Sequence, residues 1–318
     1  MSKKLKLRWV LQHEPIDLFQ RTAENFAKEI GISTNGRIEI EILNLFDHLV
    51  KNNLGAEIDP IDLIAANEAD MSQVQVEHLG RWDASDFYAF DLPFLFSSHE
   101  HATRVFDGKI GQDLLNGLAD VTPVTGLGFT YSGGYRAIAA NKQIKTADDL
   151  IGLEIVINTN PVMVDTAEAF GCKATSIRIT DRSVEARATR SKMAAVDTTL
   201  PRYRTEANPD LHKFVTNTKH SMFLTTIIIG TDTWKEISPE DQVAMRAAAL
   251  SSAAFERQWT IDQGDAIANS VDLQHKLGFS FSEFDETEAV KLRERANVVY
   301  EKYTQFFSPG LIDGIIRA

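Results

Sequence analysis

Two hydrophobic periods organise the N-terminal part of the chain. Residues 37–43 alternate apolar and polar side chains, which is the period of a strand with one buried face. Upstream, a stripe at helical spacing is formed by Phe19, Thr22, Phe26 and Ile30. A further strand is predicted at residues 5–11, before Pro15, and completes a strand, helix and strand order. This order predicts a parallel sheet with right-handed crossovers, and therefore an α/β fold.

Several secondary-structure elements are predicted close together in the middle of the chain. An apolar strand is predicted at residues 124–129, followed by a turn at Gly133-Gly134 with Arg136 just after it. This position would hold Arg136 on a short rigid element. Thr146 has the features of a helix N-cap with acidic residues in the first turn, and Gly152 would end that short helix.

A second strand is predicted at residues 153–157, directly after this helix. Its end carries Asn158, Thr159 and Asn160. Polar side chains at the carboxyl ends of strands commonly face the ligand cleft of an α/β protein. Asn158 is therefore a candidate ligand contact, and the alternative is a solvated loop residue.

A long helix is the main expectation for the C-terminal third. Ser238 can cap it, Pro239 suits its first position, and no further proline occurs before Pro309. A helix from Pro239 to about Lys276 would extend roughly 55 Å, so it should break near Gly264 or lie along two domains. Shorter helices are predicted at 60–66, 162–170 and 183–193, and strands at 72–76 and 175–179.

Composition excludes several classes of function. With 318 residues and 43% hydrophobic side chains, the chain suits one large or two ordinary domains. A formal net charge of -12 argues against nucleic-acid binding, which needs clustered Lys and Arg. No apolar run approaches the about 18 residues of a membrane span. The N-terminus does not have the pattern of a signal peptide, which leaves a cytoplasmic protein or one whose leader was replaced by a start codon.

Motifs for catalysis and for cofactor binding are missing from the sequence. There is no Gly-x-Ser-x-Gly, Walker or dinucleotide fingerprint. His99 and His101 would point to different faces of a helix start and lack a third ligand, so no metal site is predicted. Cys172 is the single cysteine and has no feature that would lower its pKa, which predicts an inert thiol. No catalytic residue and no cofactor is expected.

Three motifs resemble the extracytoplasmic solute-binding proteins of TRAP transporters, the DctP family. They are the Gly-x-Arg that ends at Arg136, the Thr-x-x-Asp-Leu-x-Gly-Leu of residues 146–153, and the leucine-proline-phenylalanine segment of residues 90–96. Weaker likeness extends over most of the chain. The resemblance implies a two-lobed α/β periplasmic binding protein (type II-like), with interleaved domains, hinge strands and a long helix bridging both lobes.

The family pattern also implies domain bounds. Lobe I would contain residues 1–124 and about 213–250. Lobe II would contain about 125–212 and about 251–280, and residues from about 281 to 318 would form a C-terminal helical segment that packs on the lobes.

The same resemblance implies a ligand site around Arg136, whose planar guanidinium would pair with a carboxylate. The family's second arginine would stand where this chain has Val156. Help for Arg136 could then come from Arg178 or Arg202. The further lining residues that the family pattern implies are Gln75, His78, His13, Glu14, Asn158 and Asp197.

As a member of this family, the protein would be a periplasmic monomer whose leader has been removed. It would capture a small polar, carboxylate-bearing organic molecule between its lobes and deliver it to a TRAP membrane permease. Because Val156 cannot pair with a carboxylate, a neutral, zwitterionic or phosphorylated ligand, or weakened binding, stays open. An enzyme on a two-domain α/β scaffold and a ligand-sensing partner of a receptor are the alternatives from other classes.

Overall fold

The protein is described by a computed structural model that covers residues 4–12, 16–45, 47–48, 58–80, 84–178 and 184–318. The chain forms two compact units. Unit 1 contains residues 1–85, 100–132 and 224–259, and unit 2 contains 86–99, 133–223 and 260–318. The chain therefore returns to each unit more than once, which agrees with the interleaved organisation expected from the sequence.

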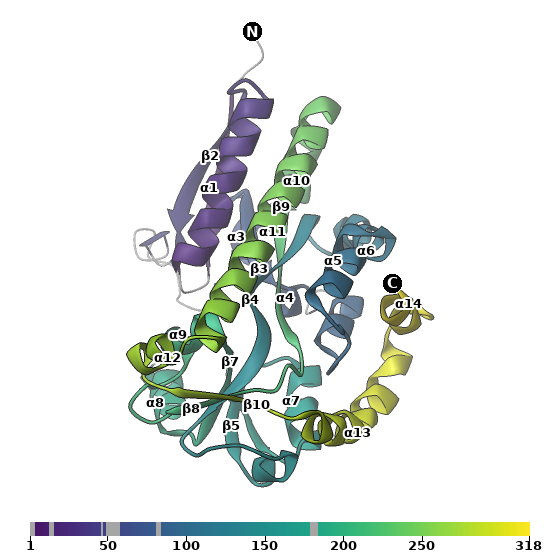
Figure 1. Ribbon diagram of the computed structural model, residues 1–318. Coiled ribbons are helices and arrows are strands. Elements are labelled where there is room, and N and C mark those ends of the chain that lie inside the picture. Colours follow the sequence, from purple (N-terminus) through teal and green to yellow (C-terminus); the bar gives the residue numbers. More distant parts are fainter. Residues whose placement is uncertain (1–3, 13–15, 46, 49–57, 81–83, 179–183) are drawn as a thin grey trace. The chain divides into compact units, whose positions relative to one another are not determined.

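Unit 1 is built on a mixed sheet. Strands β2 (Ile38–Asn44), β1 (Leu5–Leu11), β3 (Met71–Gln75), β9 (Met222–Gly230) and β4 (Val124–Ala140) follow one another in that order. β1 pairs in parallel with both β2 and β3, whereas β3 and β9 are antiparallel (Figure 1). The strand, helix and strand order at the N-terminus thus gives the parallel pairing that its hydrophobic pattern predicts.

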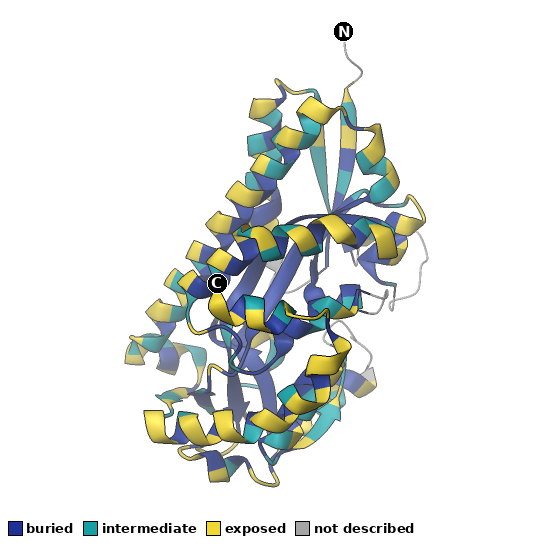
Figure 2. Ribbon diagram, turned by 90° about the vertical axis from the view of Figure 1, so that its right-hand side faces the viewer, coloured by how far each residue is buried: buried dark blue, intermediate teal, exposed yellow. Residues whose placement is uncertain are grey.

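The helices of unit 1 pack their apolar sides on this sheet. The stripe of α1 (Ile16–Ser33) is buried, and its Phe26 ring lies 5.2 Å from the ring of Trp9 on β1. Figure 2 shows buried strands and helices whose outer sides are exposed. The remaining helices wholly or mainly in this unit are α3 (Pro60–Ala65), α4 (Val76–Gly80), α5 (His99–Asp107), α6 (Lys109–Val121) and α10 (Thr231–Glu236).

Unit 2 has its own strands, and hydrophobic residues pack on both faces of the sheet that they form. From the end of β4 the order continues through β7 (Ala195–Thr199), β5 (Glu154–Ile157) and β6 (Lys173–Ser176). β8 (Phe214–Asn217) pairs with β4 and with β10 (Ser280–Glu283). Alternate residues of the strands enter two different hydrophobic clusters, one containing Ile138 and Ile155 and the other Ala139 and Val156.

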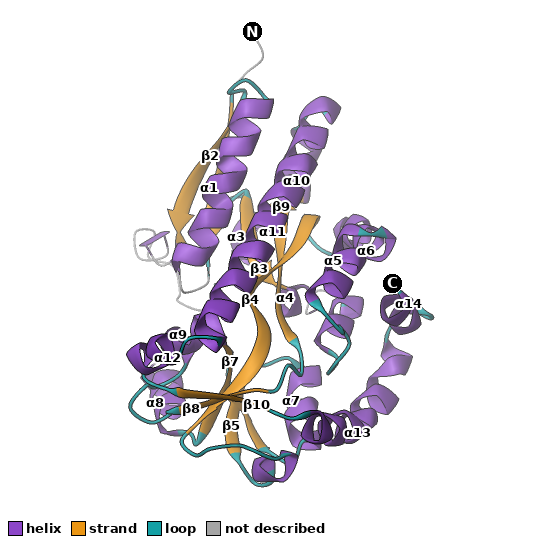
Figure 3. Cartoon of the chain, in the orientation of Figure 1, coloured by secondary structure: helices purple, strands orange, loops and turns teal. Residues whose placement is uncertain are grey.

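Helices cover the strands of unit 2, as the secondary-structure view in Figure 3 shows. The α-helices are α7 (Pro161–Ala169), α8 (Val184–Lys192), α9 (Tyr203–Glu206), α12 (Val271–Leu277), α13 (Glu286–Tyr303) and α14 (Leu311–Arg317). The short 3-10 helices are η1 (Ser85–Asp91), which begins at the end of unit 1, and η2 (Ala147–Leu150), η3 (Leu200–Arg202) and η4 (Thr304–Phe306). The cap predicted at Thr146 is confirmed, because Thr146 and Asp149 form a capping box at the start of η2.

The long helix of the C-terminal third is α11 (Pro239–Ala268), which runs in both units. It passes through Gly264 without a break. The helix ends instead at Ala268, and Ser270 caps the separate helix α12 by accepting a hydrogen bond from the Leu273 amide. The prediction that a helix in this region extends along both domains is therefore confirmed, although its C-terminal limit is earlier than expected.

Two local predictions are wrong. Gly133-Gly134 does not make a turn, because β4 continues through both glycines as one strand of 17 residues. Gly133 and Gly134 have φ angles of +142° and +68°, and a Cβ on Gly133 would collide with the Thr199 hydroxyl. Gly133 therefore permits β4 to approach Thr199 of β7 closely. The strand expected at 175–179 corresponds to β6, which begins and ends earlier, at Lys173–Ser176, and residue 179 lies outside the described residues.

The unit boundaries also differ from the predicted lobe boundaries. The chain changes unit inside β4, between Ser132 and Gly133, and inside β9, between Phe223 and Leu224. The predicted boundaries near residues 125 and 212 coincide with the start of β4 and a loop before β8. Strand ends are visible in a sequence pattern, whereas the point at which a continuous strand changes unit is not. Residues 281–318 belong to unit 2.

Candidate ligand-binding site

Arg136 and Asp197 form a buried ion pair between neighbouring strands of unit 2. In the antiparallel pair β4–β7, Arg136 lies opposite Thr199 and Ile138 lies opposite Asp197. Side chains at this spacing share one face of the sheet, so Arg136 and Asp197 are diagonal neighbours. Arg136 Nη1 donates to Asp197 Oδ2 at 2.9 Å, and each side chain is only 1% exposed.

The Arg136 guanidinium is only partly satisfied. Its Nε and Nη2 atoms are buried and have no hydrogen-bond partner among the described residues. Its Cζ atom also lies 5.1 Å from the centroid of the Phe223 ring. A buried charged donor without an acceptor is costly. Because Nε and one Nη group present two nearly parallel N–H bonds, the open side of Arg136 matches the geometry of a carboxylate.

Only one of the two carboxylate oxygens of Asp197 accepts a hydrogen bond. Its Oδ1 atom is buried without a hydrogen bond and lies 3.6 Å from His220 Nε2. Burial raises the pKa of Asp197 to about 6, with the Arg136 charge acting in the opposite direction and Glu206 adding to the rise. Burial, helped by the Arg136 charge, lowers the pKa of His220 to about 3. His220 is therefore neutral near pH 7, and its Nδ1 is 2.6 Å from Thr218 Oγ1.

Two residues whose backbones neighbour that of Arg136 also carry unsatisfied hydroxyls. Thr199 Oγ1 and Ser221 Oγ are both buried and make no hydrogen bond with the described residues. Thr199 is the direct cross-strand neighbour of Arg136, and the Arg136 amide donates to the Ser221 carbonyl at 2.9 Å. Partnerless polar atoms are rare in protein interiors. Arg136 and Asp197 therefore carry buried polar atoms that a polar ligand can contact.

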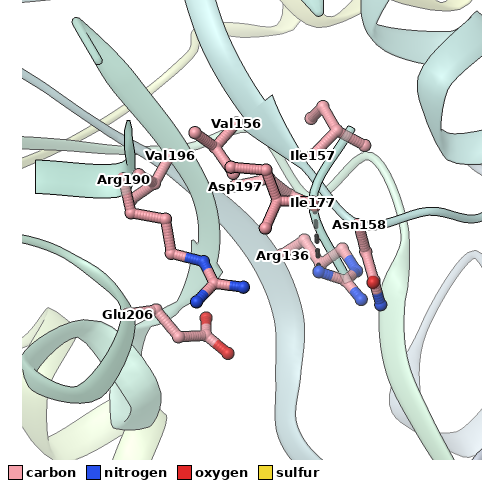
Figure 4. A pocket seen from close by; sticks show the side chains of 9 residues that line it. All are labelled: Arg136, Val156, Ile157, Asn158, Ile177, Arg190, Val196, Asp197 and Glu206. Carbon is pink, nitrogen blue, oxygen red and sulfur yellow. Dashed lines mark hydrogen bonds and ion pairs between the residues drawn. The ribbon is translucent and has the colours of Figure 1, made fainter. Parts of the chain in front are cut away.

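A pocket in unit 2 opens beside these groups, with an empty volume of about 340 Å³ that includes some open solvent. Its polar lining consists of Arg136, Asn158, Asp197, Arg190 and Glu206, and its apolar lining of Val156, Ile157, Ile177 and Val196. Figure 4 shows the Arg136 guanidinium turned toward Asn158, and Arg190 turned toward Glu206.

The Glu206 end of the pocket is tightly organised. Glu206 Oε1 accepts from Arg202 Nε at 2.8 Å and from Arg202 Nη2 at 2.7 Å, and Glu206 Oε2 accepts from Thr198 Oγ1 at 2.6 Å. The buried Arg202 guanidinium also lies 4.2 Å from the centroid of Phe223, the same ring that Arg136 contacts. Arg136 and Arg202 are thus held on one aromatic ring, each with a carboxylate partner.

Several residues proposed from the sequence lie around this pocket. Arg136, Asn158, Val156 and Asp197 line it, and Arg202 supports it through Glu206. Val156 belongs to the cluster on the other sheet face from Arg136. Arg178 is not among the lining residues that the structure describes, and its carbonyl accepts from Arg190 Nη2 at 2.5 Å.

The candidates from the first lobe belong to unit 1 or lie outside the described residues. Gln75 is buried at the end of β3 opposite Thr225, and His78 is buried in α4 with its Nδ1 hydrogen bonded to Asp59. His13 and Glu14 lie outside the described residues. The ligand roles of all four remain predictions.

Sequence reasoning missed Arg190, Glu206 and Ser221. Arg190 belongs to a basic run in α8 that also contains Arg187 and Lys192, and spacing alone does not single out one of them. Glu206 and Ser221 gave no signal, because their roles depend on how separate segments meet. In the described parts of the chain, no cluster of three His, Cys, Asp or Glu side chains is placed to hold a metal ion. Burial raises the pKa of the Cys172 thiol to about 12, consistent with inertness.

Comparison with known proteins places the chain in a class. The profile of the family described as bacterial extracellular solute-binding protein, family 7 (DctP), matches residues 12–305. The chain therefore belongs to this family of extracytoplasmic solute-binding proteins. Within it, the chain is a solute-binding protein of the TRAP transporter type, as the motifs around Arg136 predicted. No helix in the described ranges has the length and apolar character needed to cross a bilayer.

Individual relatives are distant in sequence but similar in fold. A solute-binding protein of Roseobacter denitrificans is 24% identical over 263 residues, 83% of this chain and 77% of the relative. Its structure with bound L-galactonate has a TM-score of 0.79 at 20% identity and covers all of both chains. A sugar acid binding protein of Advenella mimigardefordensis in complex with galactonate has a TM-score of 0.84 at 19% identity, covering 100% of this chain and 98% of that one.

A third relative differs in the ligand that it is named for. The C4-dicarboxylate-binding protein of Bacillus subtilis is 20% identical over 300 residues, which is 93% of this chain and 81% of the relative. These similarities establish the two-lobed α/β fold of TRAP solute-binding proteins for this chain.

Proposed function

We propose that this protein binds a small organic acid in the pocket of unit 2 and delivers it to a TRAP membrane permease. The observation that carries the proposal is the buried Arg136 guanidinium, whose Nε and Nη2 atoms have no acceptor among the described residues. A carboxylate would supply two acceptors in the geometry that this edge of the guanidinium requires. The sugar acids bound to the two structural relatives support the same ligand class.

The same proposal covers where the protein acts, what happens to the ligand and which further residues contact it. The protein acts outside the cytoplasm, releases its ligand unchanged and carries out no reaction on it. Gln75 and His78 are proposed as further ligand contacts, as the family resemblance implies. Closure of two lobes on the ligand would provide the differential affinity that separates capture from release.

The experiment is isothermal titration calorimetry of the purified protein with a panel of sugar acids and other hydroxylated organic acids. We expect at least one acid to bind, and Arg136→Lys to weaken its binding by roughly 100-fold, because lysine cannot reproduce the planar fork. Recovery of the unchanged acid after incubation would agree with transport, whereas turnover would contradict it.

Arg257→Lys is the matched control. Arg257 is also a buried arginine, but it lies in unit 1, where its Nη1 donates to the Phe129 carbonyl at 2.8 Å and its Nη2 to Asp107 at 2.6 Å. Both variants replace a buried guanidinium, and only Arg136 has open donors. Equal losses of affinity in the two variants would show that Arg136 acts through stability alone, and circular dichroism checks that each variant is folded.

A further inference from the structure

His220 faces the carboxylate oxygen of Asp197 that Arg136 does not use. Its Nε2 atom lies 3.6 Å from Asp197 Oδ1, which accepts no hydrogen bond from the described residues. Asp197 Oδ2, by contrast, accepts from Arg136 Nη1 at 2.9 Å. The distance of 3.6 Å is too long for a hydrogen bond, so His220 acts on Asp197 through the charge distribution of its ring.

Asp197 and His220 both line a small cavity whose other walls are mainly apolar. Two further polar side chains, Thr166 and Cys172, line the same cavity, and neither forms a hydrogen bond with Asp197 Oδ1. Thr166 Oγ1 donates its proton to the Val162 carbonyl at 2.7 Å. A thiol such as that of Cys172 is only a weak donor. Among the described lining residues, His220 is therefore the group best able to direct an N–H at this oxygen.

The His220 ring has a defined orientation. Its Nδ1 lies 2.6 Å from Thr218 Oγ1, and its edge-to-face contact with Phe170 has a centroid separation of 5.8 Å at 89°. The His220 carbonyl also accepts from the Phe94 amide at 2.7 Å. The side chain is buried, and all of these residues belong to unit 2. The contacts fix which ring nitrogen faces Asp197.

The same contacts determine which ring nitrogen carries the proton. His220 is neutral near pH 7, so one nitrogen is protonated and the other is bare. At pH 7.5 Asp197 is mostly ionised, because its pKa is about 6. A bare Nε2 would direct a lone pair at a negatively charged oxygen, whereas the Thr218 hydroxyl can donate as readily as it accepts. The favourable arrangement has Thr218 donating to Nδ1 and the proton on Nε2.

An N–H in this position affects how Asp197 pairs with Arg136. A carboxylate with both oxygens available forms two parallel hydrogen bonds with one guanidinium. Here only Oδ2 bonds to Arg136, and the arginine Nε and Nη2 atoms stay open. Without an N–H from His220, Asp197 could turn its second oxygen to the arginine. The donors that an organic acid needs would then be occupied by the protein itself.

We propose that His220, with its proton on Nε2, is a positioning residue that restrains Asp197 to a single hydrogen bond with Arg136 and thereby keeps the arginine open for a ligand. This inference rests on the proposed function, because it concerns how the same arginine is kept available. The restraint itself joins two residues of the free protein, so its first test needs no ligand.

That test is a long-range proton–nitrogen correlation spectrum of the protein with 15N-labelled histidine at pH 7.5. His212 is an internal reference, because it is buried, its Nδ1 accepts from the Asn208 amide at 2.9 Å, and its Nε2 lies 2.9 Å from the Met193 carbonyl. This geometry requires the proton on Nε2 of His212. We expect His220 to show the same pattern. A proton on Nδ1 of His220, or on both nitrogens, would overturn the proposal.

The second test measures ligand affinity by calorimetry at pH 7.5. The probe is the acid that the wild type binds best among galactonate, glucuronate and the other acids of the panel above. His220→Phe keeps a ring but has no N–H, and should weaken binding by roughly tenfold. His220→Gln restores an amide N–H and should stay within about threefold of wild type. Equal losses in the two variants would show that the imidazole shape matters and the N–H does not.

His212→Phe and His212→Gln are the matched controls. They replace another buried, neutral histidine of unit 2, whose two ring nitrogens contact backbone groups and no carboxylate. Both should bind the probe like wild type. Circular dichroism checks that all four variants are folded, and the spectrum of the wild type decides the proposal if His220→Phe does not fold.

A double-mutant cycle tests whether His220 acts through Asp197. In an Asp197→Ala background there is no carboxylate to restrain, so His220→Phe should change affinity by less than about twofold. A loss that stays near tenfold in this background would contradict the proposed route. If wild type binds an acid and folded His220→Phe binds it equally well, the role of His220 is wrong and the proposed function stands. If wild type binds no acid, both are wrong.

Discussion

Asp197 in unit 2 and Glu256 in unit 1 are both buried carboxylates, yet their surroundings are opposite. Glu256, on α11, accepts hydrogen bonds from Gln73 Nε2 at 3.0 and 2.8 Å on its two oxygens, and another from Ser132 Oγ. Asp197 accepts one hydrogen bond from a charged partner, and its other oxygen has none. Burial raises the pKa of both acids.

The difference shows how a buried acid can serve stability or binding. The Glu256 cluster joins β3, β4 and α11 through neutral donors on both carboxylate oxygens, although the Oε1 atom of Gln73 in the same cluster is buried without a hydrogen bond to the described residues. The Asp197 cluster leaves donors and acceptors open on neighbouring residues of one sheet. A satisfied network fixes the backbone, whereas an incomplete one has a cost that a ligand can remove.

The largest expected effect is the loss of stability when Glu256 in unit 1 is replaced. Glu256→Ala should lower the free energy of unfolding by about 4 kcal/mol, because it leaves the buried donors of Gln73 and Ser132 without their acceptor and opens a cavity. Urea unfolding followed by circular dichroism measures the change. A loss below about 1 kcal/mol would show that water or rearranged side chains replace the carboxylate easily.

The second effect is the pH dependence of stability that Asp197 causes. Its pKa in the folded protein is raised to about 6 from an ordinary value of 3.8, so the folded state holds this proton more tightly than the unfolded state. Stability from this group is therefore fully present below about pH 4 and is lost as the pH rises to about 6, by about 2 to 3 kcal/mol. Unfolding curves from pH 4 to 7 for wild type and Asp197→Asn should diverge in this sense. Parallel curves would mean that Arg136 keeps Asp197 ionised throughout.

A third prediction compares two buried serines. Ser132→Ala removes a hydrogen bond to Glu256 and should destabilise the protein by about 2 kcal/mol. Ser221→Ala removes a hydroxyl that has no hydrogen bond, so it should change stability by less than about 0.5 kcal/mol. Urea midpoints of both variants measure this contrast. Equal losses would contradict the division between a satisfied and an open cluster.

The smallest expected effect is on ligand affinity. Ionised Asp197 competes with a ligand carboxylate for Arg136, and protonation removes this competition. Affinity for a monocarboxylate should therefore rise by roughly fivefold from pH 7.5 to 5.5, before the ligand itself becomes protonated near pH 4. Calorimetry at the two pH values measures the change, and Asp197→Asn should abolish it. Affinity that falls over this range in wild type would contradict the proposed competition.

Much of the fold could be read from local patterns. The alternation at 37–43, the cap at Thr146 and the uninterrupted run after Pro239 each depend on neighbours in the sequence, and β2, η2 and α11 follow from them. Gly133-Gly134 was misread because glycine permits both a turn and a close strand contact, and only the position of Thr199 decides between them.

The site was less accessible to sequence reasoning. Arg136 could be proposed because it ends a motif that resembles the family, and Asn158 because it follows a predicted strand. The contacts that make the pocket are cross-strand or between short helices, such as Arg136 with Asp197 and Arg202 with Glu206. Register and packing determine these contacts. The spacing within α8 could not identify Arg190 as the basic residue that lines the pocket.

The close approach of β4 to β7 at Gly133 has an evolutionary consequence. Because any side chain at position 133 would occupy the space of the Thr199 hydroxyl, the two positions share a fixed volume. A relative with alanine at the first position should therefore carry glycine or alanine in place of the threonine and also have a changed backbone there, because the φ of +142° at Gly133 strains any other residue. Such a relative would lose a hydroxyl beside its arginine. Substitutions at these two sites are expected to appear together across the family, and to accompany changes in ligand.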